Sequence, residues 1–313
     1  MYGAGEPVIQ TFGLTKSFKN KLAVDGLSLT VHRGDIYAFL GQNGAGKSTT
    51  IKMLLGLLYP SKGYAEILNT KVPGELCKVL PRIGVVTESP AFYPYLTGEE
   101  NLSLYGGLLG IKDKKKIKDT LERVGLLGVK QKVSEYSQGM RQRLALGLAT
   151  LNGPELLMLD EPTNGLDPQG IYEIKSIIRD MNKNGVTIFL SSHILSEVQE
   201  IASRVGVIHK GKLIAEGLVS ELLAFGDRIT VMASPRDLVL KVLKENPIVK
   251  DFTEDTDKFI IYIDKENVST LNREMVNAGI DVFALIPVRS TLEDFFISIT
   301  GDDNVNSGTL QAI

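Results

Sequence analysis

The sequence predicts an α/β protein that carries a second, smaller α+β domain at its C-terminus. Three patterns support this prediction. From about residue 8 to residue 218, short apolar runs alternate with amphipathic segments, as in strands joined by crossover helices. Between about residues 90 and 149 the pattern becomes almost entirely helical. After residue 218 the order changes to βαββαβ, which is typical of a split βαβ sandwich.

The strands of the first region are short and several are apolar on both faces, as expected for a parallel sheet covered by helices. They are Ile36–Leu40, Gly84–Val86, Leu156–Leu159, Thr187–Leu190 and Val205–Ile208. An amphipathic helix is predicted between the first two, because four apolar residues recur there at helical spacing: Ile51, Leu54, Leu55 and Leu58.

The helical insertion opens with a capping box, Thr97 to Glu100. Ile117, Leu121 and Val124 share one face of its next helix, and Gly125 fits the end of that helix. The basic run Lys112–Lys118 could contact phosphate or lipid headgroups, but a solvated helix face is the favoured interpretation.

In the C-terminal region we expect strands at 228–233, 248–252, 259–263 and 282–286, with helices at 236–244 and through Leu271 and Met275. Ser290 to Glu293 is predicted to cap a last helix, whose residues at core spacing are Leu292, Phe295, Phe296 and Ile299. The expected domains are 1–220 and 221–302, the second ferredoxin-like, with a tail at 303–313. We expect the second domain to support folding, although dimerisation or regulation is also compatible with it.

Composition narrows the classes of function. The chain has 313 residues, of which 43% are hydrophobic and 23% charged, which excludes wholesale disorder. A net charge of -2 does not favour a nucleic-acid partner. Cys77 is the only cysteine, so neither an intrachain disulfide nor a cysteine metal site is expected. The sequence has no apolar run of spanning length and no secretory leader, so we expect a cytoplasmic protein that reaches a membrane only through a partner.

Residues 41–48 match a P-loop, the pattern of a glycine-rich loop between a strand and a helix that binds nucleotide phosphates. Glycines let backbone N–H groups surround the β-phosphate at the positive end of the helix. Lys47 can reach the β- and γ-phosphates, and the Ser48 hydroxyl can ligate Mg²⁺. A glycine turn that matches by chance is disfavoured by this context. The expected ATP-binding residues of the loop are Gly41, Gln42, Asn43, Gly44, Ala45, Gly46, Lys47, Ser48 and Thr49.

The run Leu156–Leu159 delivers two carboxylates to the C-terminal end of a buried strand, where open α/β sheets bind ligands. Asp160 can hold Mg²⁺ through water, and Glu161 can orient and deprotonate an attacking water. A strand that ends in Asp-Glu is common by itself. Together with the P-loop, it predicts a nucleoside triphosphate site with Mg²⁺ as its metal.

Taken with further motifs, residues 8–218 resemble the nucleotide-binding subunit of an ATP-binding-cassette (ABC) transporter. Tyr136–Arg143 resembles the family's signature motif, Gly165–Asp167 its D-loop, and Ser191–His193 the segment with its switch histidine. Phe18 stands where the family has an aromatic that stacks on adenine; taken alone it would be interpreted as a core aromatic. The resemblance implies a P-loop NTPase fold: a RecA-like core, an antiparallel β part and a helical subdomain at about 90–150.

The resemblance also implies a site shared between two chains. The signature residues, namely Ser137, Gln138, Gly139 and Met140, would meet the γ-phosphate of ATP held by a second ABC subunit, in a homodimer. Asp167 would couple the two sites, and His193 would contact the γ-phosphate. An integral membrane permease would be the other partner, with the subunit on the inner face of the membrane.

The chain departs from the family pattern at Glu88, where Gln is usual. A carboxylate only accepts hydrogen bonds, yet Glu88 could ligate Mg²⁺ or hold the catalytic water. The substitution resembles the E-loop of lantibiotic-immunity and bacitracin-type exporters, and our hypothesis is that Glu88 couples the site to the permease. A neutral replacement is an equally open interpretation.

Two further departures concern the signature, where Gln138 replaces a usual Gly and Met140 a usual Gln. Ser-x-Gly-Met variants belong to the drug and peptide exporter branch. Phe92, Tyr93 and Tyr95 could line the groove for a permease helix or pack the helical lobe, and both interpretations stay open.

The predicted function is therefore the ATP-hydrolysing subunit of a membrane exporter, in the branch that exports antibiotics or antimicrobial peptides. A cassette ATPase that acts on ribosomes or DNA is the alternative. A single cassette and the lack of a long heptad insertion argue against it. A non-hydrolysing regulatory subunit is a third possibility, and intact Lys47, Asp160, Glu161 and His193 argue against that one.

Overall fold

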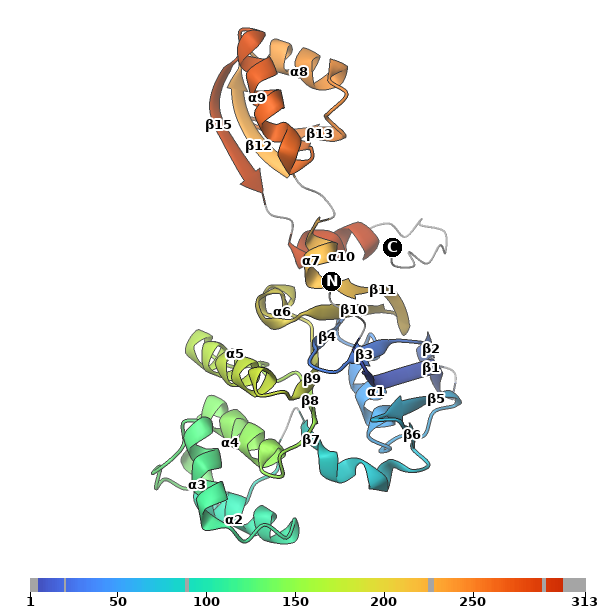
Figure 1. Ribbon diagram of the computed structural model, residues 1–313, viewed down its shortest axis with the longest axis vertical. Coiled ribbons are helices and arrows are strands. Elements are labelled where there is room, and N and C mark those ends of the chain that lie inside the picture. The colour runs from blue at the N-terminus through green and yellow to red at the C-terminus, as the bar shows by residue number, and fades with distance from the viewer. Residues whose placement is uncertain (1–4, 20, 88–89, 225–227, 289–290, 301–313) are drawn as a thin grey trace. The chain divides into compact units, whose positions relative to one another are not determined.

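The computed structural model describes residues 5–19, 21–87, 90–224, 228–288 and 291–300. The chain divides into two compact units, one that ends at Leu218 and one that begins at Val219. Each unit has its own buried core. Figure 1 labels the helices and strands of both.

The first unit is built on a six-stranded sheet. Its order is β11 (Lys212–Leu218), β10 (Arg204–His209), β4 (Ile36–Leu40), β9 (Thr187–Ser192), β8 (Leu156–Asp160) and β7 (Ile83–Val86). All neighbours are parallel except the β10–β11 pair. Every residue of β4, β8 and β9 is buried, because layers of structure cover both sheet faces. The five strands predicted for this region are all present, with ends that shift by two residues or fewer.

A five-stranded antiparallel sheet stands beside it, as the resemblance implies. Its strands are β1 (Pro7–Phe18), β2 (Lys21–Leu27), β3 (Thr30–His32), β5 (Lys62–Ile67) and β6 (Thr70–Val72). Helix α1 (Lys47–Leu54) buries Ile51, Met53 and Leu54 in one core with residues of both sheets. The position of the P-loop helix is therefore fixed by two layers.

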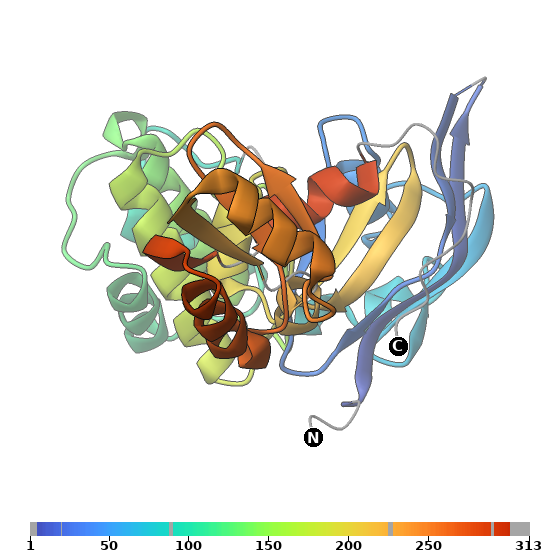
Figure 2. The same ribbon diagram turned by 90° about the horizontal axis from the view of Figure 1, so that it is seen from above.

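Helices cover the remaining surfaces of this unit. Helices α5 (Pro168–Lys183) and α6 (Leu195–Ile201) pack against strands of the six-stranded sheet, and α2 (Gly98–Leu108), α3 (Lys114–Arg123) and α4 (Gln138–Thr150) form the helical insertion. Figures 1 and 2 both show α2–α4 and the antiparallel sheet on opposite sides of the six-stranded sheet. Short 3-10 turns occur at Leu76–Lys78, Leu80–Arg82 and Val133–Glu135.

The local predictions for the helices are confirmed with one exception. Thr97 and Glu100 form a reciprocal capping box at the start of α2, and Ile117, Leu121 and Val124 are buried on one side of the α3 segment. Leu55 and Leu58, however, do not belong to the P-loop helix. That helix ends at Leu54 because Gly56 adopts a left-handed φ of 66° and terminates it.

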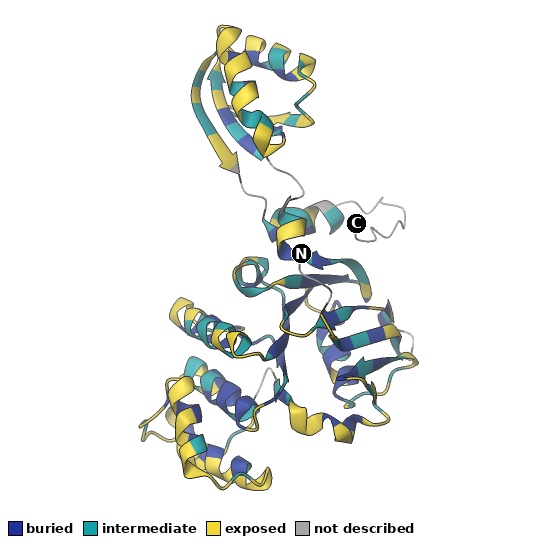
Figure 3. Ribbon diagram, viewed as in Figure 1, coloured by how far each residue is buried: buried dark blue, intermediate teal, exposed yellow. Residues whose placement is uncertain are grey.

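The second unit contains a four-stranded antiparallel sheet of order β13 (Asp251–Glu254), β14 (Phe259–Tyr262), β12 (Arg228–Ser234) and β15 (Asp281–Val288). This is the strand order of a split βαβ sandwich. Helices α8 (Arg236–Glu245) and α9 (Val268–Asn277) bury Val239, Leu243, Leu271 and Met275 against it. A 3-10 turn at Lys265–Asn267 precedes α9. Figure 3 shows the exposed outer surfaces of these helices.

The strand predicted at 248–252 begins too early in the sequence. Asn246 accepts a hydrogen bond from the Ile248 N–H through its side chain and from the Val249 N–H through its backbone, so a turn occupies this stretch and the strand begins at Asp251.

Helices α7 (Val219–Ala224) and α10 (Leu292–Thr300) complete the second unit. The predicted cap Ser290 lies outside the described residues. Thr291 takes that role, since its hydroxyl accepts the Asp294 N–H at 3.1 Å and the Asp294 carboxylate accepts the Thr291 N–H at 3.0 Å. Leu292 and Phe296 of α10 are buried, as the core spacing predicts.

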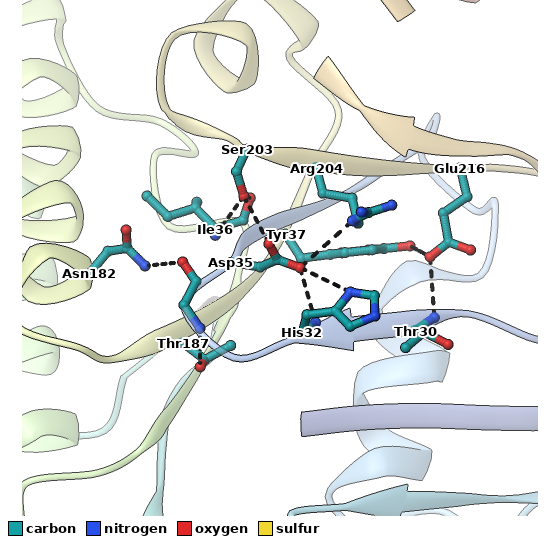
Figure 4. A network of polar contacts seen from close by, with 11 residues as sticks. Thr30, His32, Asp35, Ile36, Tyr37, Asn182, Thr187, Ser203, Arg204 and Glu216 are labelled. Carbon is teal, nitrogen blue, oxygen red and sulfur yellow. Dashed lines mark hydrogen bonds and ion pairs between the residues drawn. The ribbon is translucent and has the colours of Figure 1, made fainter. Parts of the chain in front are cut away.

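A polar network holds the amino end of β4 (Figure 4). The fully buried Tyr37 hydroxyl donates to the Glu216 carboxylate at 2.8 Å, which also accepts the Thr30 N–H at 3.2 Å. Burial raises the pKa of Glu216, and the hydrogen bonds from Tyr37 and Thr30 oppose that rise. Since Thr30 belongs to the antiparallel sheet and Glu216 to the other, this cluster ties the two sheets together.

Candidate nucleotide-binding site

A cavity of about 510 Å³ opens at the carboxyl ends of β4, β8 and β9, which is where α/β sheets bind ligands. The loop 41–46, between β4 and α1, forms one wall, and the segments that follow β8 and β9 form another. The residues that line the cavity are Phe18, Lys21, Ala23, Asn43, Gly44, Gly46, Lys47, Ser48, Thr49, Glu161, Asn164 and His193.

The loop conformation requires glycine where it meets α1. Gly46 has a φ of 116°, and a β-carbon there would lie 2.6 Å from the backbone oxygen of Ala23. Glycine at residue 46 therefore allows the loop to pass close to Ala23 and α1 to begin at Lys47. The first turn of α1 then lies at the cavity. An anion is stabilised at such a helix start by the first N–H groups and by the helix dipole.

Lys47 is buried and held by the loop itself. Its Nζ donates to the backbone oxygen of Gly41 at 2.6 Å and to that of Gln42 at 3.3 Å. The same atom lies 3.1 Å from Oε1 of Glu161, and only 5% of the lysine side chain is exposed. A positive charge is thus fixed between the loop and the carboxylate that follows β8.

Glu161 connects two of the predicted site residues. Its Oε1 pairs with Lys47, and its Oε2 lies 2.8 Å from Nδ1 of His193. The backbone of Glu161 has a left-handed φ of 51°, a conformation that strains a residue with a side chain. Strain of this kind persists where surrounding contacts impose it, and here the Glu161 N–H donates to the Ser191 hydroxyl at 3.0 Å.

Asp160 lies next to Ser48. The Ser48 hydroxyl donates to Oδ1 of Asp160 at 3.3 Å, and the buried Ser191 hydroxyl donates to the same oxygen at 2.6 Å. Carboxylate and hydroxyl oxygens are the ligand types that Mg²⁺ takes in proteins, together with water and phosphate oxygens. The chemistry of this pair therefore fits a magnesium ion.

The structure brings most of the predicted ATP-binding and catalytic residues to this one cavity. Phe18 is 45% exposed at the end of β1 and lines it. Gly41 and Gln42 contribute carbonyls to Lys47, and Ala45 of the same loop is buried. Glu88 lies outside the described residues.

The predicted signature residues do not line this cavity. Ser137 caps α4, its hydroxyl accepting the Met140 N–H at 3.2 Å, and Gln138 and Gly139 follow at the start of the helix. Asp167 caps α5 in the same way, through the Gly170 N–H at 3.1 Å. Both helices therefore present their amino ends outside the cavity of their own chain, which is the arrangement that a shared site needs.

The prediction missed four residues of the site: Lys21, Ala23, Asn164 and Ser191. Only Ser191 left a signal in the sequence, since two serines directly follow the apolar run 188–190 of strand β9. A hydroxyl at a buried strand end must find a partner, and here it finds Asp160.

A P-loop between a buried strand and a helix, with paired carboxylates at the end of a neighbouring parallel strand, defines a P-loop nucleotide-binding protein. Residues 24–164 match the ABC transporter family. The chain is 40% identical to the bacitracin transport ATP-binding protein BcrA of Bacillus licheniformis over 302 residues, which cover 95% of this chain and 99% of that protein. It therefore belongs to the ABC transporter family, as an ATP-binding protein, and it is an ATPase.

Two further likenesses agree with this assignment. The daunorubicin resistance ATP-binding protein DrrA3 of Streptomyces coeruleorubidus is 36% identical over 308 residues, 95% of this chain and 97% of that protein. Among solved structures, the dimeric bacterial ABC transporter cassette MJ0796 superposes with a TM-score of 0.61 at 25% identity, over 67% of this chain and 98% of that one. Within the described part of the chain, every helix is too short or too polar to cross a bilayer.

Proposed function

We propose that this chain is the motor subunit of a membrane exporter for antibiotics or antimicrobial peptides, and that two copies hydrolyse two Mg-ATP to drive a permease. The proposal rests on one observation: in one cavity beside the P-loop, Glu161 contacts both Lys47 and His193.

ATP binding falls to the loop and its surroundings. The N–H groups at the start of α1 and the ammonium of Lys47 would hold the β- and γ-phosphates. Phe18, exposed at the cavity rim, would stack on the adenine ring.

Ser48 and Asp160 would hold Mg²⁺, and Glu88 is a further proposed ligand. The ion would neutralise charge on the phosphate oxygens. Ser191 keeps Asp160 in place, because its hydroxyl donates to the carboxylate from the adjacent strand. One carboxylate oxygen thus stays directed at Ser48.

Glu161 would be the general base. When Lys47 turns to the phosphates, the carboxylate is released to accept a proton from water. His193 would hold that carboxylate through the 2.8 Å contact and reach the γ-phosphate with its other ring nitrogen. Glu88, which precedes the helical insertion in the sequence, would join the site to the permease.

A complete site would need two chains. Ser137, Gln138, Gly139 and Met140 would meet the γ-phosphate bound by the partner, with the N–H groups and dipole of α4 as the recognition element. Asp167 would link the two sites. The likeness to a cassette solved as a dimer supports this pairing.

The permease would dock on the helical insertion. An apolar hollow of about 310 Å³ lies between β7 and helices α2 and α4, and its walls include exposed leucines: Leu80, Leu108 and Leu109. Tyr105 belongs to this hollow and packs against Phe92 and Tyr93, with ring centroids 6.4 and 6.1 Å away. An apolar helix of a membrane subunit would fit here and would hold the chain at the cytoplasmic face of the membrane.

The substrate class comes from relatives. One has a name that refers to bacitracin transport and another to daunorubicin resistance, and both match nearly the whole chain. The accessory unit would then support folding of the subunit. The alternative of an ATPase that acts on ribosomes or DNA has no comparable support, since these full-length relatives are not proteins of that kind by name.

Co-expression tests the proposal. The chain should sediment with membranes only when a polytopic permease is co-expressed with it, and Lys47→Ala should abolish ATPase activity without loss of membrane association. Co-sedimentation with ribosomes in the absence of the permease would favour the alternative.

A further inference from the structure

Gln138, at a position where the resemblance has glycine, makes a contact with the segment that follows β8. Its Nε2 donates a hydrogen bond to the backbone oxygen of Asn164 at 2.9 Å. A β-carbon on Gly165 would lie 2.7 Å from the same Nε2 and 3.3 Å from Oε1. The carboxamide of Gln138 therefore covers the backbone at Asn164 and Gly165 so closely that a side chain at residue 165 would displace it.

The contacted segment begins at the proposed general base. The Asn164 N–H donates to the backbone oxygen of Glu161 at 3.2 Å and closes a turn directly after that residue. Asn164 itself lines the ATP cavity. A side chain of α4 is thus bonded to the last residue of a four-residue turn whose first residue is Glu161.

The opposite side of the same turn is held by α6. The buried Thr163 hydroxyl donates to the Glu197 carboxylate at 2.5 Å, and Glu197 lies on the helix that follows His193. This contact is partly buried, whereas the bond from Gln138 is exposed. Exposed hydrogen bonds exchange with water at little net cost, so the Gln138 bond is the one that can break and re-form during a cycle.

The amino ends of α4 and α5 also touch. A β-carbon on Gly139 would lie 3.9 Å from Cα of Gly170, and Arg143 pairs with Glu173 at 3.4 Å. A shift of the α4 amino end therefore meets the segment 164–173 at several points. The bond from Gln138 reaches the turn that begins at Glu161 itself.

We propose that Gln138 is a positioning residue that couples the position of the α4 amino end to the position of Glu161 in the same chain. The inference rests on the proposed function, in which the α4 amino end meets ATP held by the partner. Binding of ATP in the partner's site would then fix the conformation of the turn that begins at Glu161 of this chain. A chain with glycine at this position has no such link.

Two variants of the full chain test the role. Gln138→Met keeps the length of the side chain without an N–H donor, and Gln138→Gly removes it. At concentrations at which the chain is monomeric, both should bind Mg-ATP with a Kd within twofold of the parent, because Gln138 does not line its own cavity. The kcat should fall about fivefold. Asn182→Leu is the matched control: it removes an amide that donates to backbone oxygens at the other end of α5, and its kcat should not change.

A double-mutant cycle separates this role from a direct contact with the partner's ATP. Gly165→Ala should lower kcat at least tenfold in the parent, because its methyl group meets the Gln138 amide. In the Gln138→Gly chain only the strain of a φ of 72° remains, so the loss should be at least threefold smaller. Equal losses in the two backgrounds would overturn the inference. Loss of Mg-ATP binding in Gln138→Met would do the same.

A failure of the proposed function would give different experimental results. If the parent chain does not bind Mg-ATP, or if Glu161→Gln turns over ATP normally, the assignment of the site is wrong and the inference falls with it. If both of those results are as expected and the two substitutions act independently, only the coupling through Gln138 is wrong. Gln138 and Asn164 are exposed, so thermal unfolding midpoints should stay within a few degrees of the parent.

Discussion

Replacing Glu161 with Gln should arrest ATP hydrolysis and tighten ATP binding. Hydrolysis stops because the amide cannot take a proton, and the loss of a general base lowers kcat by about 10²- to 10⁴-fold. Binding tightens because the carboxylate competes for Lys47. Its Oε1 lies 3.1 Å from Nζ, and the exposed fractions of the two side chains are 5% and 12%.

The size of the competition follows from that geometry. A hydrogen bond to a charged partner contributes about 1.5–3 kcal/mol, and a neutral amide oxygen at the same place keeps roughly half of it. In the variant, the contact of Lys47 that a phosphate must displace is therefore weaker by about 1 kcal/mol than in the parent. This corresponds to a Kd for Mg-ATP about fivefold lower.

The assay combines nucleotide titration with phosphate release and size-exclusion chromatography, where the variant should accumulate as an ATP-bound dimer. Glu75→Gln is the control, since Glu75 pairs with Lys78 at 2.9 Å on an exposed surface away from the cavity. A kcat within twofold of the parent would refute Glu161 as the base. A weaker Kd would refute the competition for Lys47 and leave the base assignment intact.

Three further outcomes are expected. Burial raises the pKa of Glu216 above its usual 4.5, against the hydrogen bonds from Tyr37 and Thr30, so the folded state binds the proton more readily than the unfolded one. The stability that this group contributes is full below the unfolded pKa and is lost as pH rises through the folded pKa. Glu216→Gln should therefore raise the unfolding midpoint relative to the parent more at pH 7.5 than at pH 5, and a gain that does not vary with pH contradicts this. Phe18→Ala should weaken ATP binding roughly tenfold, as loss of base stacking does, with a smaller effect on kcat; unchanged affinity in a titration would exclude the stacking role. Thr97→Ala removes the reciprocal cap of α2 and should cost about 1 kcal/mol in denaturant unfolding, whereas Ser103→Ala, inside the same helix, should cost less.

Local patterns were sufficient for the central strands and for the P-loop. The strands β4, β8 and β9 are buried along their whole length, so each leaves an uninterrupted apolar run between polar segments. The P-loop and its lysine are contiguous in the chain, and a contiguous motif carries its geometry with it. Strands that are buried on one face only are harder to predict from the sequence.

The antiparallel sheet is an example. Its strand β2 mixes exposed, half-buried and buried residues without regular alternation, and β3 and β6 have three residues each. Such short or mixed segments do not differ in composition from loops, and only the resemblance indicated an antiparallel part. The misplaced β13 has the same cause, since Ile248 and Val249 are apolar but occupy a turn that the side chain of Asn246 fixes.

The contacts within the site depend on strand order, which no local pattern contains. Glu161 meets His193 because β9 lies beside β8 in parallel register, with Asp160 opposite Ser191. Each strand therefore ends at the same edge and delivers its next residues side by side. That edge also receives the P-loop, because β4 is the other neighbour of β9 and its Leu40 stands opposite Ser192. One central strand, β9, thus sets the distance from Lys47 to Glu161 and from Glu161 to His193. A substitution that disturbed its packing would separate all three groups while every motif in the sequence remained intact.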